Sequence, residues 1–387
     1  MNAMDPQAAV RTERTINVVV IDDSAFMRKS ISMMLESDPG IKVVATARDG
    51  QDGINKIREF HPDIATLDVE MPVMDGLSAL RVIMKEMPLP VIMISSLTSE
   101  GAQATLDALD IGAVDFIPKE LSYVSVDIKK IKEELIAKVR TIVRSRPRRF
   151  RGAGGAGATG SPGGAVGSGG AEVPGKGLLL HTAPRTGSVW NVPAGAGSRL
   201  KAAVLGISTG GPFALLQTIP KLPADFPLGI AIVQHMPPRF TKSLAERLDG
   251  LSALHVKEAE EGDVLGQGMV LIAPGGHHMT FRRKGADIAA CIGTEPSSTL
   301  YRPCADIMIT SAVEVFNAPL LGIIMTGMGK DGLEGLRRLK AKGGVVIAQD
   351  EESCVVYGMP RAAVDDGIAD AILPLDGIPG GLTRLFN

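Results

Sequence analysis

Short hydrophobic runs alternate with amphipathic stretches from Asn17 onward, and this pattern is the first structural signal in the chain. The runs are NVVVI, KVVATA, DIATLD, PVIMIS and DFIPK, with helix-like segments between them. Continuous apolar strands that alternate with helices are typical of a parallel sheet covered by helices on both faces. A final stretch, SVDIKKIKEELIAKVRTIV, has apolar residues at helical spacing and predicts the helix that completes this half.

The pattern stops in residues 144–197, where glycine, alanine and serine dominate and large apolar side chains are rare. Such a composition cannot offset the entropy lost on ordering, so we expect a flexible linker. From residue 198 the alternation resumes with AAVLGIS, LGIAIVQH, MVLIAP, LLGIIMTG and VVIAQ. The sequence therefore predicts two doubly wound α/β domains, a five-stranded one over 17–143 and a second over 198–387, after a disordered tail of residues 1–16.

Charge and composition exclude several classes of function. The chain of 387 residues carries 41 Lys and Arg against 43 Asp and Glu, which argues against nucleic acid as a partner. Its three cysteines lack the spacing of a zinc site or a disulfide framework and fit a reducing compartment. The N-terminus has no apolar signal core, and no run approaches the roughly 20 apolar residues of a membrane span. We expect a cytoplasmic protein with no direct membrane insertion.

Acidic residues follow two strands of the first predicted domain. In such sheets the chemistry lies at the carboxyl ends of the strands, and the first and third strands can be neighbours. Asp22 and Asp23 follow the first strand and Asp68 follows the third, so the three carboxylates would converge and favour Mg²⁺ among them. Ser95 and Lys119 follow later strands, where a hydroxyl and an ammonium group could stabilise a phosphoryl group on one carboxylate.

The second domain carries a serine among glycines, in VLGISTGGP. Gly206 to Gly210 satisfy G-x-S-x-G, the turn that exposes a nucleophilic serine, here Ser208. A glycine loop before a helix can also hold a phosphate. The stretch has neither the G-K-[ST] ending of a P-loop nor the three-glycine spacing of a dinucleotide fingerprint, so the decision depends on a base within reach.

His235 is the candidate base, because it ends the strand that follows the serine's own strand. His255 starts a probable strand and is interpreted as structural, while His277 and His278 could line a cleft or be exposed. The orienting acid that a catalytic imidazole needs is sought at other strand ends. Asp331 is preferred because its loop resembles that of the serine, with Asp350 and Asp263 as rivals.

Residues 17–143 resemble a response-regulator receiver domain, on the motifs IDDS, LDVEMPVMDG, ISS and DFIPK. The resemblance implies that Asp68 accepts a phosphoryl group from a histidine kinase. It also implies roles around that aspartate: Mg²⁺ ligation by Asp22, Asp23, Asp68 and the Glu70 backbone carbonyl, phosphoryl contacts by Ser95 and Lys119, and an aromatic switch position at Phe116.

From about Leu200 the chain resembles the catalytic domain of the chemotaxis methylesterases, the CheB family. The motifs are GISTGGP, VQHMP, EGD, LIAPGGHHM, YRPCADIM, TGMGKDG and SCVVYGMP. The resemblance implies site roles for six residues: Ser208 as nucleophile, His235 as general base and acid, Asp331 as orienting carboxylate, Thr209 and Met328 beside the serine with the Met328 backbone as oxyanion donor, and Arg302 near the site.

The activity that this resemblance implies is hydrolysis of glutamate γ-methyl esters on chemoreceptors, activated by phosphorylation and needing no cofactor for the ester chemistry. Because an amide can form the same acyl intermediate, deamidation of receptor glutamines is expected too. Two rival functions are a transcriptional output, which would need a helix-turn-helix, and nucleotide binding, which would give His235 and Asp331 no role.

Overall fold

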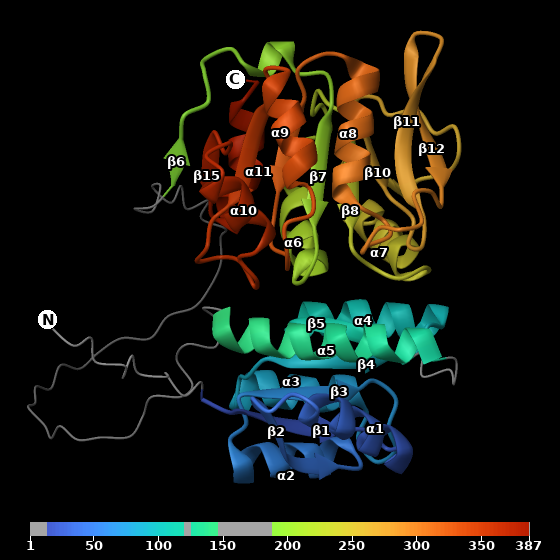
Figure 1. The fold of residues 1–387 in the computed structure, drawn as a ribbon, viewed down its shortest axis with the longest axis vertical. Helices are drawn as coiled ribbons and strands as arrows, with labels where there is room; N and C mark the ends of the chain where they lie inside the picture. Colours follow the sequence, from blue (N-terminus) through green and yellow to red (C-terminus); the bar gives the residue numbers. More distant parts are fainter. Residues whose placement is uncertain (1–13, 120–124, 146–187, 387) are drawn as a thin grey trace, which may run out of the picture.

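The computed structural model describes residues 14–119, 125–145 and 188–386, which form two halves, each built around a central sheet (Figure 1). The expected tail of residues 1–16 falls largely within 1–13, and the expected linker falls largely within 146–187. Both of these ranges lie outside the described residues. None of the helices in the described part has the length and apolarity to cross a membrane.

The first half alternates strands and helices as expected from the hydrophobic pattern. Its elements are β1 (Ile16–Ile21), α1 (Ala25–Glu36), β2 (Ile41–Ala47), α2 (Gly50–Phe60), β3 (Ile64–Asp68), α3 (Gly76–Glu86), β4 (Val91–Ser95), α4 (Ser99–Ile111), β5 (Asp115–Pro118) and α5 (Ser125–Ser145). The sheet has the order β2-β1-β3-β4-β5 and all its pairs are parallel. The predicted five-stranded doubly wound sheet is confirmed.

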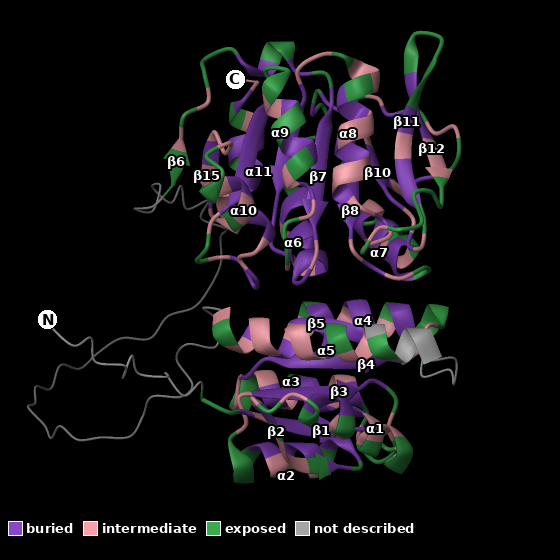
Figure 2. Ribbon diagram, viewed as in Figure 1, coloured by how far each residue is buried: buried purple, intermediate pink, exposed green. Residues whose placement is uncertain are grey.

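Helices cover both faces of this sheet, and its strands other than the edge strand β2 are almost wholly buried (Figure 2). Helices α1 and α5 pack on one face, and α2, α3 and α4 pack on the other. Four of the helices begin at a residue whose side chain accepts a hydrogen bond from the first turn: Ser24, Asp49, Asp75 and Thr98. These caps start the helices close to the strand ends, which keeps the acidic residues at one edge of the sheet.

The second half is built around a larger sheet. Its elements are β6 (Val189–Trp190), η2 (Gly197–Arg199), β7 (Ala203–Ile207), α6 (Gly211–Thr218), η3 (Ile219–Lys221), β8 (Ile230–Gln234), α7 (Phe240–Asp249), β9 (His255–Glu258), β10 (Met269–Ile272), β11 (His278–Lys284), β12 (Asp287–Gly293), α8 (Ala305–Phe316), β13 (Leu321–Ile324), α9 (Leu333–Ala341), β14 (Val345–Gln349), α10 (Met359–Asp365), β15 (Ala371–Leu373), η4 (Leu375–Gly377) and α11 (Ile378–Arg384).

The order of this sheet is β6-β15-β14-β13-β7-β8-β10-β9, with only β6 antiparallel to its neighbour. From β7 the chain first builds outward through β8, and later returns to place β13 on the other side of β7. The edge between β7 and β13 is therefore the point at which the strand order reverses. In doubly wound sheets, the crevice at such a point is where ligands bind.

Three features depart from the expectation. Ile16, which was assigned to the disordered tail, is the buried first residue of β1. Val189 and Trp190 form β6 on the edge of the second sheet, so the structured part of this half starts before residue 198, inside the range assigned to the linker. Strands β11 and β12 form a separate antiparallel hairpin rather than part of the parallel sheet. Both elements depend on pairing with a partner strand, which a helix-strand alternation does not encode.

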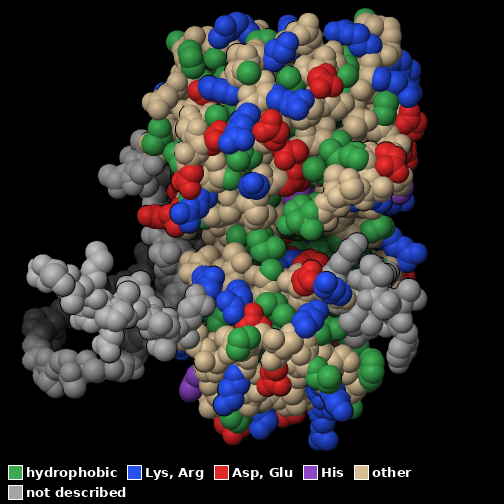
Figure 3. Space-filling view, viewed as in Figure 1, with side chains coloured by type: hydrophobic (Ala, Val, Ile, Leu, Met, Phe, Trp, Pro, Cys, Tyr) green, Lys and Arg blue, Asp and Glu red, His purple; other side chains and the backbone are tan. Residues whose placement is uncertain are grey.

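The two halves meet along α4, β5 and α5 of the first half (Figure 1). Phe116 on β5 stacks on Phe240 of α7, with ring centroids 4.5 Å apart and planes 15° apart. Arg247 of α7 forms ion pairs with Asp107 and Asp110 of α4. Hydrophobic side chains gather at the same junction on the face shown in Figure 3. The junction thus combines an apolar centre with charged contacts beside it.

Helix α5 also reaches the loops at the carboxyl edge of the second sheet. Thr141 donates a hydrogen bond to the Met328 sulfur over 3.7 Å, and Ser145 donates to the Val355 carbonyl over 2.7 Å. Met328 and Val355 lie in the loops after β13 and β14. The first half therefore packs against the edge where the second sheet carries its polar residues.

Candidate functional site

Ser208 lies in a tight turn directly after β7, at the reversal point of the second sheet. Its backbone N–H donates to the Thr326 carbonyl over 3.0 Å, and its own carbonyl accepts from the Gly211 N–H over 2.8 Å. Gly210 adopts φ 76°, which favours glycine, and α6 begins at the next residue. The strand-turn-helix context that the G-x-S-x-G motif requires is present.

The buried side chain of Gln234 packs against the turn that carries Ser208. Its Nε2 donates to the Ser208 carbonyl over 3.0 Å and to the His235 carbonyl over 3.3 Å. A Cβ atom on Gly211 would lie 1.9 Å from the Gln234 Oε1, so this glycine is required by close approach. Because the amide occupies the space behind the first turn of α6, the glycines here pack against protein rather than frame an open phosphate loop.

His235 follows β8, the strand paired with β7, and it contacts Asp331. The His235 Nε2 and the Asp331 Oδ2 are 2.8 Å apart, and both side chains are more than nine-tenths buried. An ionised carboxylate accepts, so Nε2 carries the proton and Nδ1 keeps its lone pair. Within the described residues, Nδ1 has no hydrogen-bond partner. The imidazole can therefore act as a base through Nδ1.

Asp331 lies against the first turn of α8, where the helix presents unpaired N–H groups. Its Oδ2 accepts from the Ala305 N–H over 2.6 Å, and its Oδ1 accepts from the Asp306 N–H over 3.0 Å and the Cys304 thiol over 3.1 Å. Burial alone would raise the pKa of Asp331, but the hydrogen bond and charge of His235 and these N–H groups lower it to about 2. The carboxylate is therefore charged at every physiological pH.

The hydrophobic pattern did not predict two side chains beside this pair. Tyr301 stacks on the His235 ring, with centroids 4.2 Å apart and planes 11° apart. Cys304 donates to Asp331, and burial followed by the Asp331 charge raises the pKa of its thiol to about 12. Both residues lie in the segment before α8, inside the motif YRPCADIM, and that motif was the only sequence signal for them.

The rival acids bind other partners. Asp350 accepts from the N–H and hydroxyl of Ser353, over 2.9 and 2.5 Å. Asp263 pairs with Lys257 over 2.9 Å. Neither contacts His235, so Asp331 is the acid that the structure brings to the base.

The other histidines of the second half also have local partners. His255 pairs with Asp249 over 2.9 Å at the start of β9. His278 is buried, and its Nε2 lies 3.3 Å from the Pro296 carbonyl. His277 contacts the Gly275 carbonyl over 3.4 Å within its own turn. These contacts fit structural roles for all three.

The three remaining residues expected near the serine differ in their surroundings. Thr209 is buried and its carbonyl accepts from the Thr326 hydroxyl over 2.9 Å. Met328 lies in the loop between β13 and Asp331, where it meets α5. Arg302 donates from Nη2 to the Ser297 carbonyl over 3.1 Å, while its buried Nε has no partner among the described residues.

The acidic residues of the first half converge as expected. Asp22, Asp23 and Asp68 offer ligand oxygens that lie within 4.8 Å of one another. Lys119 brings one positive charge, with its Nζ 2.5 Å from Asp68 and 3.4 Å from Asp22. Burial is the main reason that the pKa of Asp68 is raised to about 6, against the opposing effect of Lys119. Three carboxylates facing one ammonium group form a donor set that fits a hard divalent cation.

The remaining residues predicted for this site, Glu70, Ser95 and Phe116, lie in three different surroundings. The Glu70 N–H donates to the Asp68 Oδ1 over 3.4 Å, which brings Glu70 to the edge. The Ser95 hydroxyl donates to the Gly101 carbonyl over 3.0 Å, toward α4. Phe116 is 4% exposed and lies in the junction with the second half.

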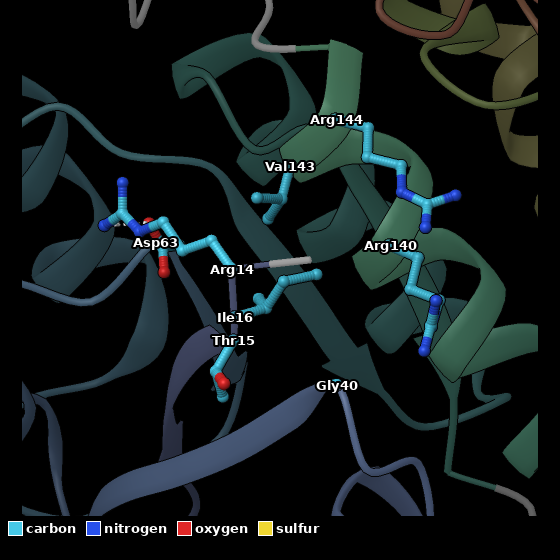
Figure 4. A pocket seen from close by; sticks show the side chains of 8 residues that line it. All are labelled: Arg14, Thr15, Ile16, Gly40, Asp63, Arg140, Val143 and Arg144. Atoms are coloured by element: carbon cyan, nitrogen blue, oxygen red, sulfur yellow. Dashed lines mark hydrogen bonds and ion pairs between the residues drawn. The ribbon is translucent and has the colours of Figure 1, made fainter. Parts of the chain in front are cut away.

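A pocket at the opposite end of the first sheet carries several arginines (Figure 4). Arg14 pairs there with Asp63 over 3.2 Å. Arg140 on α5 donates from Nε to Asp38 over 2.6 Å. This pocket lies where β1 begins, whereas Asp68 lies at the end of its neighbour β3, so the pocket is separate from the acidic cluster.

Comparison with known proteins agrees with this geometry. Residues 203–382 match the CheB methylesterase family, and residues 18–128 match the response regulator receiver domain. The protein-glutamate methylesterase/protein-glutamine glutaminase 1 of Oleidesulfovibrio alaskensis is 49% identical, over 93% of this chain and 96% of its own. The corresponding protein 2 of Nitratidesulfovibrio vulgaris is 48% identical, over 95% and 98%.

Among solved structures, the CheB methylesterase catalytic domain of Thermotoga maritima is similar to the second half. It has 45% sequence identity and a TM-score of 0.47, and it covers 48% of this chain and 98% of that chain. The curated relatives, in contrast, align along almost the whole sequence at nearly half identity. The chain therefore belongs to the family of protein-glutamate methylesterase/protein-glutamine glutaminases, with a response regulator receiver domain before a CheB methylesterase domain.

Proposed function

We propose that this protein hydrolyses glutamate γ-methyl esters of chemoreceptors and deamidates receptor glutamines, under control of phosphorylation at Asp68. The observation that carries the proposal is the buried His235–Asp331 pair at the strand ends beside Ser208, with the Nδ1 of His235 unpaired among the described residues. A serine hydroxyl, an imidazole and a carboxylate are the three groups that constitute the acyl-transfer machinery of serine hydrolases.

In the proposed first step, the Ser208 hydroxyl attacks the ester carbonyl while His235 takes its proton at Nδ1. The imidazolium then gives that proton to the departing methanol, which leaves the glutamyl group as an ester on Ser208. Water attacks this acyl-enzyme with the help of the same nitrogen and releases the glutamate carboxylate. With a glutamine side chain, ammonia leaves in place of methanol.

Asp331 holds His235 in the tautomer that these reaction steps need. Because Asp331 accepts at Nε2–H, the free lone pair is on Nδ1. The base nitrogen is thus Nδ1 and the nitrogen bound to the carboxylate is Nε2, whereas in serine proteases Nε2 is the base. The carboxylate also stabilises the imidazolium that forms during each half-reaction.

We assign the oxyanion of the tetrahedral intermediates to backbone N–H groups near the serine. Met328 is the main candidate, because its loop runs between β13, the neighbour of β7, and Asp331. Thr209 follows the nucleophile directly and is the second candidate. Backbone donors fixed by surrounding structure stabilise developing charge without reorganising during the reaction. Arg302 is proposed to contact the substrate nearby.

In the first half, we propose that a histidine kinase phosphorylates Asp68. Asp22, Asp23, Asp68 and the Glu70 carbonyl would hold Mg²⁺, which offsets negative charge on the phosphoryl group when it is bound. Lys119, whose Nζ lies 2.5 Å from the Asp68 carboxylate, would contact the phosphoryl oxygens. Ser95 would reach them after its hydroxyl leaves the Gly101 carbonyl.

Regulation follows from the junction between the halves. Helix α5 contacts Met328, next to the proposed oxyanion site, so we propose that the unphosphorylated receiver limits access to Ser208. Phosphorylation would shift the population toward an open state by weakening the junction, in which Phe116 stacks on Phe240.

The direct test replaces Ser208 with alanine. We expect methanol release from a methylated receptor, and ammonia release from its glutamines, to fall at least about a thousand-fold, because no nucleophile remains. Ser198→Ala, at an exposed serine, is the matched control and should leave both rates unchanged. If Ser208→Ala turned over at the wild-type rate, the serine mechanism would be wrong.

A further inference from the structure

Tyr301 is the side chain that packs flat against the proposed base. Its ring lies 4.2 Å from the His235 ring, centroid to centroid, and the planes are only 11° apart. Parallel aromatic rings at this separation attract each other, and the face of an electron-rich phenol ring also favours a cation next to it. The contact therefore acts on the imidazole in both of its protonation states.

The bond to Asp331 leaves one degree of freedom of the imidazole undetermined. Nε2 lies close to the Cβ–Cγ axis and moves little as the ring turns about that bond, so a single hydrogen bond from Nε2 restrains the ring plane only weakly. The carboxylate itself is held by three further donors from Cys304, Ala305 and Asp306. A flat contact on the ring face is what sets the plane in which Nδ1 points.

The segment that carries Tyr301 connects the two partners of the triad. Tyr301 lies three residues before Cys304, whose thiol donates to Asp331. One short stretch of chain thus fixes the imidazole plane at one end and the carboxylate at the other. A shift of this segment would move both groups together rather than separate them.

The hydroxyl of Tyr301 is not needed for this contact. Among the described residues, this hydroxyl has no hydrogen-bond partner. Burial, followed by the charge of Asp331, raises the pKa of the phenol above its ordinary value, so it stays protonated at neutral pH. Any contribution of Tyr301 to the base therefore comes from its ring.

We propose that Tyr301 is a positioning residue, whose ring sets the plane of the His235 imidazole so that Nδ1 is directed at the Ser208 hydroxyl. This inference rests on the proposed function, because it assumes that Ser208 is activated by His235. It predicts that the aromatic ring matters and the hydroxyl does not. The conservative variant Tyr301→Phe keeps the stack, and Tyr301→Leu removes it while filling similar space.

The test measures how fast Ser208 of the full-length protein reacts with a small alkyl fluorophosphonate. The probe forms an O–P bond to the serine and releases fluoride, and the serine proton passes to the base. Tyr301→Phe should react within about two-fold of wild type, and Tyr301→Leu should react about ten-fold more slowly, since a stack contributes up to one order of magnitude. The loss should fall on the maximal rate, with the half-saturating probe concentration unchanged.

One control separates this role from a role at the junction between the halves. Each rate is measured with and without a small phosphodonor and Mg²⁺, because Glu134 and Lys138 of α5 lie near Tyr301. If Tyr301 only stabilised the junction, Tyr301→Leu would change how strongly the phosphodonor stimulates the protein, but its stimulated rate would equal that of wild type. That result would overturn the proposal. If Tyr301→Leu fails to fold, Tyr301→Met takes its place.

A second readout uses the wild-type protein directly. Stacking should shift the His235 imidazole C–H signals upfield in NMR spectra, and the shift should persist in Tyr301→Phe. Equal labelling rates for wild type and folded Tyr301→Leu would overturn the inference and leave the nucleophile intact. Absence of labelling in wild type, with or without phosphodonor, would instead overturn the nucleophile itself and this inference with it.

Discussion

At the scale of single residues, the chemistry depends on how many donors face the Asp331 carboxylate. It accepts hydrogen bonds from His235, Cys304, Ala305 and Asp306. Among the described residues, it forms no ion pair with a lysine or arginine. An arrangement of four donors around two oxygens suits a carboxylate and opposes an amide, which brings hydrogens of its own.

We therefore predict that Asp331→Asn lowers kcat for ester hydrolysis by about 10³ to 10⁴ fold, as expected when an imidazole loses its orienting acid. The amide would face N–H groups of α8 and could favour the wrong tautomer of His235. Initial rates of methanol release measure the effect. Asp350→Asn, at the rival acid that binds Ser353, is the control and should retain most of the activity. A small effect at Asp331 and a large one at Asp350 would contradict the assignment.

The same carboxylate has a signature in the pH dependence of stability. Its pKa is lowered to about 2, so its ionised form stabilises the fold above about pH 4, and this contribution is lost as the pH falls toward about 2. The difference in unfolding free energy between wild type and Asp331→Asn should therefore shrink by up to about 2 kcal/mol as the pH falls over that range. Urea unfolding followed by the fluorescence of Trp190, the single tryptophan, reports it.

The positions of the three proposed triad residues could be predicted from the sequence because each follows a hydrophobic strand. Ser208, His235 and Asp331 all lie at the edge where parallel strands end, but Asp350 also follows a strand, so periodicity placed the serine and the histidine and left the acid open. Tyr301 and Cys304 could not be found in this way, because they lie in the irregular segment between β12 and α8, whose path is set by tertiary contacts. Periodicity also gave no direction for the Ser95 hydroxyl, which turns toward Gly101.

At the scale of elements, the start of α6 is tightly constrained by its packing. Gly211 opens this helix against Gln234, which is 1% exposed and cannot move without losing its bonds to the Ser208 and His235 carbonyls. The packing therefore links the turn of Ser208 to the end of β8, where His235 lies.

We expect Gly211→Ala to lower the unfolding free energy by about 1–3 kcal/mol, since the added methyl group overlaps the Gln234 amide. Activity should fall with it because the turn is displaced. Gly380→Ala in α11 is the matched control, since an added Cβ meets nothing within 4 Å there. Urea unfolding and methanol release measure both variants. A Gly211→Ala protein as stable and as active as Gly380→Ala would refute this account of the turn.

Elements with a strong internal pattern were predicted, and those defined by pairing were not. The long amphipathic α5 and the buried central strands are visible in the sequence alone. Strand β6 has only two residues and is specified by its partner β15, so composition assigned it to the linker. The hairpin of β11 and β12 depends on antiparallel register, which the parallel α/β interpretation overlooked.

At the scale of the whole molecule, the junction between the halves connects the two candidate sites. Arg247 clamps α4 through Asp107 and Asp110, and Phe240 of the same helix α7 covers the switch position Phe116. A change in the receiver that moves β5 or α4 would therefore act directly on α7. This is a physical route from Asp68 to the esterase edge that needs no contact between the sites themselves.

We predict that Arg247→Glu raises the activity measured without phosphodonor several-fold and reduces the stimulation by phosphodonor. The reversal replaces two ion pairs with like-charge contacts and favours the open state. Arg361→Glu, at an exposed pair within α10, controls for the charge change. Methanol release at low and high ionic strength measures it. An unchanged basal rate in Arg247→Glu would rule out a role of this clamp in restraint.

The central claim is that ester hydrolysis passes through a covalent intermediate on Ser208. The most direct measurement mixes the phosphodonor-treated protein with a methylated receptor, quenches in acid within the first turnover, and locates any adduct by mass spectrometry of the digested chain. The account predicts a glutamyl ester of receptor sequence on the peptide containing Ser208, formed together with the first equivalent of methanol, and absent in Ser208→Ala. Methanol release without any adduct at this serine, and at an equal rate in Ser208→Ala, would contradict it.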